Sequence, residues 1–154
     1  MSDLMVRPLS SADQAQWSAL WSGYNAFYGR LGATALSDAI NATTWSRLLD
    51  PAEPVLGFVA EKGGALVGLA HVVLHRSTIQ VQDNCYLQDL FVDDAVRGAG
   101  VGRALIEAVY AFARTQGLPK VYWQTQEANA TARRLYDTLA APTGFIVYRK
   151  VLAP

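Results

Sequence analysis

Several features that would define a function at once are missing from this sequence. Its 154 residues include a single cysteine, Cys85, so no disulfide can form within the chain. Because Cys85 stands at the start of a predicted strand, we interpret it as a packing residue rather than a nucleophile. No apolar run reaches the length of a membrane span, and the first residues lack the basic and apolar regions of a signal peptide. We therefore expect a cytoplasmic protein with no membrane partner.

An excess of either charge is also missing. Lysine plus arginine total 13, and so do aspartate plus glutamate, which gives no support for nucleic acid as a partner. The composition is 51% hydrophobic and 17% charged, as in globular proteins, and the length fits one domain spanning residues 1–154. His71 and His75 alternate on one predicted strand without acidic or cysteine neighbours at metal-ligand spacing, so we expect no metal.

Two common nucleotide-binding motifs are absent although glycines cluster at positions 98, 100 and 102. A P-loop needs Lys-Ser/Thr after its last glycine, but Arg103-Ala104 follows Gly102. A dinucleotide fingerprint needs G-x-G-x-x-G, and the third glycine position falls on Arg103 or Leu105. What remains is Arg-x-x-Gly-x-Gly at positions 97–102.

This glycine segment lies between a predicted strand, residues 84–92, and a predicted helix, residues 100–116. The first N–H groups of a helix have no acceptor within it, and the macrodipole adds about half a positive charge there. Glycines let the backbone approach a phosphate, and the guanidinium of Arg97 offers donors that suit phosphate oxygens. The segment therefore predicts a diphosphate site, with a simple tight turn as the alternative.

Apolar periodicity and turn residues predict the remaining elements. Strands are expected at 4–9, 55–61, 65–75, 84–92, 120–124 and 145–152, with a hairpin turn at 62–64. Helices are expected at 13–24, 38–49, 100–116 and 129–139, with a loop at 23–32. The order β-α-α-β-β-β-α-β-α-β predicts an α/β (α+β) fold, a mixed sheet with helices on both faces.

The chain resembles the GNAT superfamily, the acetyl-CoA-dependent N-acetyltransferases, most specifically from Tyr86 to Tyr136. The resemblance rests on the glycine loop with its flanks and on Asn129-Ala-Thr-Ala-Arg-Arg-Leu-Tyr136. In motif it is nearest to polyamine and thialysine acetyltransferases. It implies a mostly antiparallel central sheet with a splayed strand pair, acetyl-CoA as co-substrate without a metal, and direct attack by a primary amine of a small molecule.

The resemblance also implies which residues bind the cofactor. Beyond the splay, the backbone of Leu90 and Val92 would pair with the pantetheine arm as an added strand would. Asn129 would contact the same arm. By position, Arg133 and Arg134 are candidates to reach the 3′-phosphate of CoA, with an exposed, solvated helix face as the alternative for both. The full implied set is Leu90, Phe91, Val92, Arg97, Gly98, Ala99, Gly100, Val101, Gly102, Arg103, Asn129, Arg133 and Tyr136.

Two residues carry the chemistry in this interpretation. Tyr136 would protonate the leaving thiolate, since a phenol and a thiol have ordinary pKa values of about 10 and 8.5; an amphipathic core residue is the alternative. Where polyamine and thialysine acetyltransferases carry Glu-Asp, this chain has Gln88-Asp89, and an amide cannot serve as a base. We expect Gln88 to orient a water or the amine, deprotonation to pass through ordered water, and Asp89 to lie on the opposite sheet face.

The acceptor and the assembly are less constrained. Candidate acceptor-binding residues are Tyr24, Tyr28, Gln88 and Asp89, together with Trp21, Asn25 and Trp123; aromatic rings suit a cation or a flat apolar group, and ordinary packing is the alternative. A lysine or N-terminal protein acetyltransferase and a non-catalytic acyl-CoA-binding module remain alternative functions. The apolar final strand, 145–152, predicts a homodimer.

Overall fold

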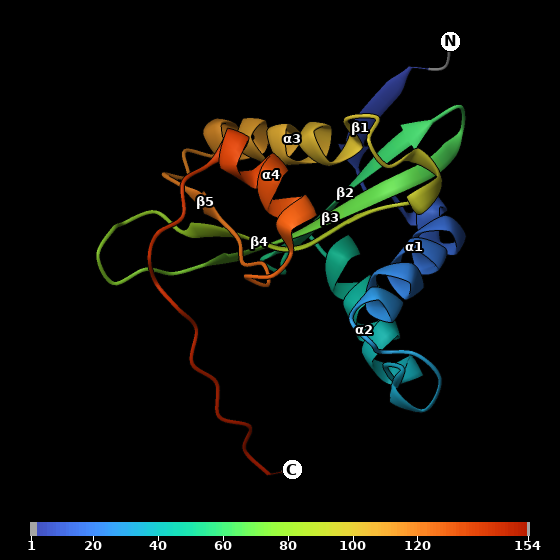
Figure 1. Ribbon diagram of the computed structural model, residues 1–154, viewed down its shortest axis with the longest axis horizontal. Helices are drawn as coiled ribbons and strands as arrows, with labels where there is room; N and C mark the ends of the chain where they lie inside the picture. Colours follow the sequence, from blue (N-terminus) through green and yellow to red (C-terminus); the bar gives the residue numbers. More distant parts are fainter. Residues whose placement is uncertain (1–2, 154) are drawn as a thin grey trace. The chain divides into compact units, whose positions relative to one another are not determined.

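The computed structural model describes residues 3–153 (Figure 1). By its internal contacts the chain divides into two units, one within Met1–Trp123 and one within Gln124–Pro154. The first unit contains a five-stranded sheet in the order β1-β2-β3-β4-β5. Its strands are β1 (Leu4–Pro8), β2 (Val55–Lys62), β3 (Ala65–His75), β4 (Asn84–Val92) and β5 (Val121–Tyr122), and its helices are α1 (Gln14–Phe27), α2 (Asp38–Leu49) and α3 (Val101–Thr115). The second unit contains α4 (Ala130–Leu139).

The sheet is mixed and mostly antiparallel, which confirms the predicted fold class. The pairs β1–β2, β2–β3 and β3–β4 are antiparallel, and β4–β5 is parallel. Gly63 and Gly64 form the two-residue turn between β2 and β3 with φ of 59° and 81°, as the predicted hairpin requires. None of the helices within residues 3–153 is long and apolar enough to cross a membrane.

Helices cover both faces of the sheet in the first unit (Figure 1). On one face, Trp17 and Leu20 of α1 pack with Leu69 of β3 in the main core cluster. On the other face, α3 lies against β3 at Gly68, where a Cβ would come within 3.1 Å of Val101 and 3.0 Å of Leu105. A glycine at this position therefore sets how closely the first turns of α3 approach the sheet.

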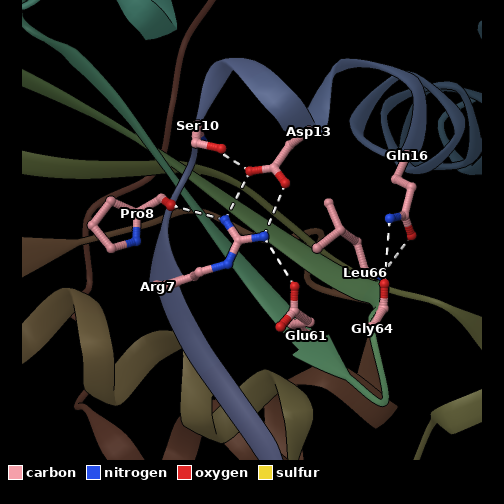
Figure 2. Close-up of polar contacts among 8 residues, drawn as sticks. All are labelled: Arg7, Pro8, Ser10, Asp13, Gln16, Glu61, Gly64 and Leu66. Carbon is pink, nitrogen blue, oxygen red and sulfur yellow. Dashed lines mark hydrogen bonds and ion pairs between the residues drawn. The ribbon is translucent and has the colours of Figure 1, made fainter.

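An ion-pair cluster anchors the entry to α1 (Figure 2). Arg7 donates from both terminal nitrogens to the carboxylate of Asp13, at 2.8 and 2.9 Å, and also to Glu61 at 3.1 Å. The hydrogen bonds from Arg7 lower the pKa of Asp13 from 3.8 to about 2. One turn on, Gln16 accepts the backbone N–H of Leu66 at 2.8 Å. These contacts join β1, the start of α1 and the β2–β3 hairpin.

Most predicted elements are present, with small changes of length. Ser37 caps α2 by accepting the N–H of Ile40 at 3.2 Å, as expected. Helix α1 continues to Phe27, so the expectation of a loop from residue 23 was wrong over its first residues. The helix passes through Gly23, where the ring of Phe91 lies 2.9 Å from the position of an ideal Cβ. Cys85 is fully buried in β4, and burial raises the pKa of its thiol to about 11, in keeping with a packing role.

The final strand is the main error of the sequence interpretation. Residues 145–152 are in no strand, and the strand expected at 120–124 is reduced to Val121–Tyr122. Apolar alternation gives residues 145–152 a preference for extended backbone, but a strand also needs a partner for its hydrogen bonds. The segment instead exposes its large apolar side chains, from 67% at Val147 to 90% at Phe145.

Candidate active site

Strands β4 and β5 separate after a short contact. They pair at Cys85–Val121 and at Tyr86–Tyr122, and the structure pairs no strand of residues 3–153 with the rest of β4 along this edge. The splayed pair that the resemblance implied is therefore present. It leaves the edge of β4 from Leu87 to Val92 without a strand partner among residues 3–153, and this unpaired edge is called the gap beside β4.

The backbone of β4 turns polar groups into this gap. Asp93 donates its N–H to the carbonyl oxygen of Val67 on β3 at 2.8 Å. Because successive residues of a strand direct their polar groups to opposite edges, Phe91 also faces β3, whereas Leu90 and Val92 face away from it. The backbone groups of Leu90 and Val92 are thus placed to pair with an extended ligand. Phe91 contributes packing, with its ring against α1.

A β-bulge lies in the middle of β4. His71 pairs with Asp89 and Val72 pairs with Leu87, so Gln88 is the extra residue without a counterpart on β3. Gln88 is exposed. Side chains alternate between the two faces of a regular strand, but a bulge interrupts this alternation. The alternation alone therefore does not support the prediction that Gln88 and Asp89 lie on opposite faces of the sheet.

The glycine loop follows β4 and leads directly into α3. Gly98 and Gly100 have φ of 83° and 81°, a region that side-chain-bearing residues rarely adopt, and Gly100 is the N-cap of α3. The first helical bond runs from the N–H of Ala104 to the carbonyl of Gly100 at 3.0 Å. The N–H groups of Val101 and Gly102 precede it and point out of the helix end. Apart from the chain neighbours of each glycine, no heavy atom of residues 3–153 lies within 4 Å of a Cβ built on Gly98 or Gly100. The loop can therefore receive an anion against its backbone.

The two arginines of this segment make ion pairs on the surface. Arg97 bonds Asp94 at 2.8 Å, and Arg103 lies 3.9 Å from Glu107. The side chains of Arg97 and Asp94 are 52% and 82% exposed, and exposed pairs of this kind contribute about 0–1 kcal/mol. A doubly charged diphosphate can therefore replace Asp94 as the partner of Arg97 at little cost.

A buried polar network lies under β4 on the α1 face. Trp17 donates its indole N–H to Nε2 of His71 at 3.0 Å, and Nδ1 of His71 lies 2.9 Å from Asp89. Because the indole is only a donor, Nε2 is the acceptor, and Nδ1 carries the proton and donates a hydrogen bond to the carboxylate of Asp89. The phenol of Tyr24 also hydrogen-bonds Asp89, and burial together with this carboxylate raises the pKa of Tyr24.

Sequence reasoning missed this network. Trp17 and His71 are 54 positions apart, and His71 and Asp89 are 18 apart. Their meeting depends on the register of β3 with β4, which the bulge shifts by one residue. Asp89 was proposed as an acceptor-binding residue; the structure gives it two neutral donors and leaves it 9% exposed.

The other acceptor candidates divide into buried and accessible groups. Trp21 and Asn25 are in the core, at 8% and 4% exposure, whereas Tyr28 is 39% exposed. The guanidinium of Arg30 lies 5.8 Å above the ring of Tyr24 and 5.4 Å above that of Tyr28. The ring faces that we expected to bind a cation are therefore already beside one.

A hollow of about 350 Å³ opens between α1 and the end of β4. Its lining includes Gln16, Gly23, Phe91, Asp93 and Asp94. Two carboxylates disfavour a diphosphate there. Gln88 and Asp89 are not among the residues that line the hollow.

The second unit carries the remaining predicted residues on α4. Asn129 is the N-cap, and its side-chain oxygen accepts the N–H of Ala132 at 3.3 Å. Arg133 donates to the backbone carbonyl of Glu127 at 2.8 Å. Tyr136 is half-buried, two turns along the helix from Asn129.

Comparison with known proteins gives a consistent family. Residues 17–140 match the acetyltransferase (GNAT) family. The D-amino-acid N-acetyltransferase of Saccharomyces cerevisiae is 33% identical over 149 residues, 96% of this chain and 90% of that protein. A mycothiol acetyltransferase of Thermobispora bispora is 32% identical over 143 residues, and the match spans 46% of its length. Among solved structures, an aminoglycoside N-acetyltransferase in complex with CoA has a TM-score of 0.80 at 19% identity, covering 97% of this chain and 96% of its own.

Proposed function

The chain belongs to the acetyltransferase (GNAT) family and is an acyl-CoA-dependent N-acetyltransferase, and we propose that it acetylates the primary amine of a small molecule. The observation that carries the proposal is the gap beside β4, which begins where β5 leaves and ends at the glycine loop. It offers a diphosphate site at one end and outward backbone groups along its side. An extended thioester fits this arrangement, and an amine can attack it directly.

We propose that acetyl-CoA binds with its diphosphate on residues 97–103. The N–H groups of Val101 and Gly102 and the guanidinium of Arg97 would hold the phosphate oxygens. The backbone of Leu90 and Val92 would pair with the pantetheine arm. The remaining proposed contacts are Gly98, Ala99, Gly100 and Arg103 in the loop and Asn129, Arg133 and Tyr136 on α4.

Two side chains are assigned to the chemistry. Tyr136 would protonate the departing thiolate, and Gln88 would orient the amine from its exposed position in the bulge. The rate enhancement would come from orienting the amine against the thioester and from stabilising the charges that develop in the transition state, because the amine attacks without a covalent enzyme intermediate. If Gln88→Ala turns over the true acceptor at the wild-type rate, its orienting role is wrong.

We propose further that the acceptor is an amino acid. Arg30 is half-buried, is oriented by a 2.7 Å bond from its Nε to the side-chain oxygen of Asn25, and lies over Tyr24 and Tyr28. A guanidinium fixed in this way suits a carboxylate. A relative of similar length is described as a D-amino-acid N-acetyltransferase, which agrees with this chemistry.

Cofactor binding is tested by calorimetry with CoA on the intact protein. We expect binding in the micromolar range, weakened at least about tenfold in Arg97→Gln because a charged phosphate contact is lost. Arg114→Gln, at the far end of α3, is the matched control and should bind as the wild type does. The absence of any heat at millimolar CoA contradicts the cofactor assignment.

The acceptor is tested by thiol release over a panel of D- and L-amino acids, polyamines, aminoglycosides and lysine peptides. For an amino acid, Arg30→Gln should raise KM about tenfold, with little change for the amine that lacks the carboxylate. Equal effects on both compounds remove the assignment of Arg30. Turnover of lysine peptides alone indicates a protein acetyltransferase, and CoA binding without turnover indicates a binding module.

The homodimer also remains a proposal. The exposed apolar side chains of residues 145–152 provide a surface that a second copy could cover. Sedimentation of the full chain, compared with a variant carrying Phe145→Ser and Ile146→Ser, tests whether this segment drives association. A monomeric wild type contradicts it.

A further inference from the structure

The second histidine of β3 makes a hydrogen-bonded pair with a tyrosine of β5. Nδ1 of His75 lies 2.9 Å from the backbone carbonyl of Arg76, and Nε2 lies 2.6 Å from the phenol oxygen of Tyr122. A carbonyl oxygen only accepts, so Nδ1 carries the proton and Nε2 presents a lone pair. The phenol of Tyr122 therefore donates to His75, and the oxygen of Tyr122 keeps lone pairs for a further donor.

The two histidines of the chain differ in what their Nε2 atoms can do. In His71 this nitrogen is 3.0 Å from the indole N–H of Trp17 and sits in a residue that is 3% exposed. A proton arriving there would have to displace the indole. In His75 the same nitrogen receives a phenol that can pass a proton on, and the ring is only half-buried, so it can exchange that proton with water.

Tyr122 stands where β4 and β5 begin to separate. Tyr86 and Tyr122 form the last parallel pair, and their rings stack at 4.8 Å with an interplanar angle of 13°. Tyr86 pairs with Val73 on β3, which alternation places on the same face as His71 and therefore on the α1 face. The backbone of Tyr122 thus lies at the narrow end of the gap in which the thioester is proposed to lie, and its phenol extends over the α1 face of the sheet toward His75.

We propose that Tyr122 and His75 form a proton relay that deprotonates the acceptor amine. The proposal rests on the proposed function. An N–H bond of the ammonium breaks and its proton bonds to the oxygen of Tyr122, while the original O–H bond of Tyr122 breaks and that proton bonds to Nε2 of His75. The positive charge moves from the ammonium to the imidazole, whose Nδ1–H stays on the carbonyl of Arg76. The neutral amine then attacks the thioester.

The relay supplies what Gln88 lacks. An amide cannot take a proton from the acceptor, whereas His75 can and then returns it to solvent. Burial raises the pKa of the Tyr122 phenol, so it remains a neutral donor at physiological pH. Tyr86 of β4 faces the pair, and Cys85 of β4 lies near enough to Tyr122 to act on it electrostatically. Arg76, beside His75 in the chain, is paired with Asp83 at 3.1 Å.

The pair itself is tested by nitrogen-15 NMR of the imidazoles in the intact protein. With two histidines, His75→Gln assigns both spectra. We expect the Nδ1–H tautomer for His75 in the wild type, and a change at Nε2 of His75 in Tyr122→Phe with the His71 signals unmoved. An Nε2–H tautomer for His75 overturns the relay without reference to activity.

The relay is tested by kcat/KM against pH, using the best α-amine among D- and L-amino acid amides, whose ammonium pKa is about 8. At pH 6.5, where the ammonium dominates, Tyr122→Phe and His75→Gln should each lose about tenfold to a hundredfold. At pH 9.5 both should come within about twofold of the wild type, and the double variant should be no worse than the poorer single. Tyr110→Phe, on α3 outside the proposed relay and the proposed cofactor contacts, is the control.

The outcomes separate the relay from the proposed function. Equal losses at both pH values, or losses that multiply in the double variant, overturn the relay while acetylation stands. If the wild type acetylates the amine and both variants have the same kcat/KM as the wild type at pH 6.5, the relay is also overturned while acetylation stands. A wild type that binds CoA but releases no thiol with any amine overturns the proposed amine acetylation, and the relay with it.

Discussion

Replacing Gly68 by alanine should weaken both the fold and the binding of CoA. An ideal Cβ at this position lies 3.0 Å from the backbone oxygen of Phe91, 3.0 Å from Cδ1 of Leu105 and 3.1 Å from Cγ1 of Val101. Comfortable contacts between carbon atoms are about 3.5–4.0 Å. The Phe91 oxygen belongs to β4 and cannot rotate away, so the strain falls on the first turns of α3.

The size of the effect follows from these contacts. Overpacking a core typically costs about 1–3 kcal/mol, and removing a glycine from a strand returns about 0.5–1 kcal/mol of chain entropy. The net loss should be about 1–2 kcal/mol, which for a chain of this length lowers Tm by roughly 2–8 °C. Because Val101 both meets the new methyl group and provides an N–H to the proposed diphosphate site, the Kd for CoA should rise at least about threefold.

Differential scanning calorimetry and CoA titration measure the two effects, and Gly23→Ala is the matched control. The Cβ at Gly23 is as tightly placed, 2.9 Å from Phe91, but it meets the end of a side chain. We expect that ring to shift and the helix to gain from alanine, leaving Tm nearly unchanged and CoA binding intact. A Gly68→Ala protein with wild-type Tm and Kd would falsify the view that this glycine sets the position of α3.

Three further predictions concern the ion-pair cluster, the thiolate acid and the buried network. Because the pKa of Asp13 is lowered on folding, the stabilisation by its carboxylate is complete above about pH 4 and is lost as the pH falls toward 2. Asp13→Asn should lower the free energy of unfolding in urea by about 1.5–3 kcal/mol at pH 7, and should reduce the dependence of that free energy on pH between 4 and 2. Tyr136→Phe should lower kcat at least about tenfold with an unchanged Kd for CoA, and equal turnover removes its role as acid. Trp17→Phe leaves Nε2 of His71 without its donor and should cost about 1–3 kcal/mol in unfolding, whereas a stability equal to wild type contradicts the buried hydrogen bond.

Local signals in the sequence were sufficient for the elements that frame the site. The paired glycines after Lys62 predicted a hairpin because the favoured two-residue turns between strands need positive φ, which glycine adopts without strain. The apolar run before Arg97 and the glycines after it likewise identified a strand, a loop and a helix start, each from residues within a few positions of one another. Such features need no knowledge of distant parts of the chain.

Contacts between distant residues were not accessible in the same way. His75 and Tyr122 are 47 positions apart, and neither residue carries a motif. The prediction of a strand at residues 145–152 was wrong for a related reason. Apolar alternation indicates extended backbone, but a strand forms only where a neighbouring strand accepts and donates its hydrogen bonds. Both cases require the register of the sheet, which composition and periodicity leave open.

The extra residue in β4, Gln88, sets the orientation both of Asp89 on the proposed acceptor side and of the Leu90 backbone on the proposed cofactor side. Tyr86 faces α1, so unbroken alternation would put Gln88 and Leu90 on that face and Asp89 on the face of α3, away from Tyr24. The bulge at Gln88 shifts the phase, and Asp89 meets His71 and Tyr24 instead. The same shift directs the backbone of Leu90 into the gap, because the polar groups of a strand alternate with its side chains. The acceptor side and the cofactor side of β4 therefore depend on a single insertion, and a deletion of Gln88 should disrupt both.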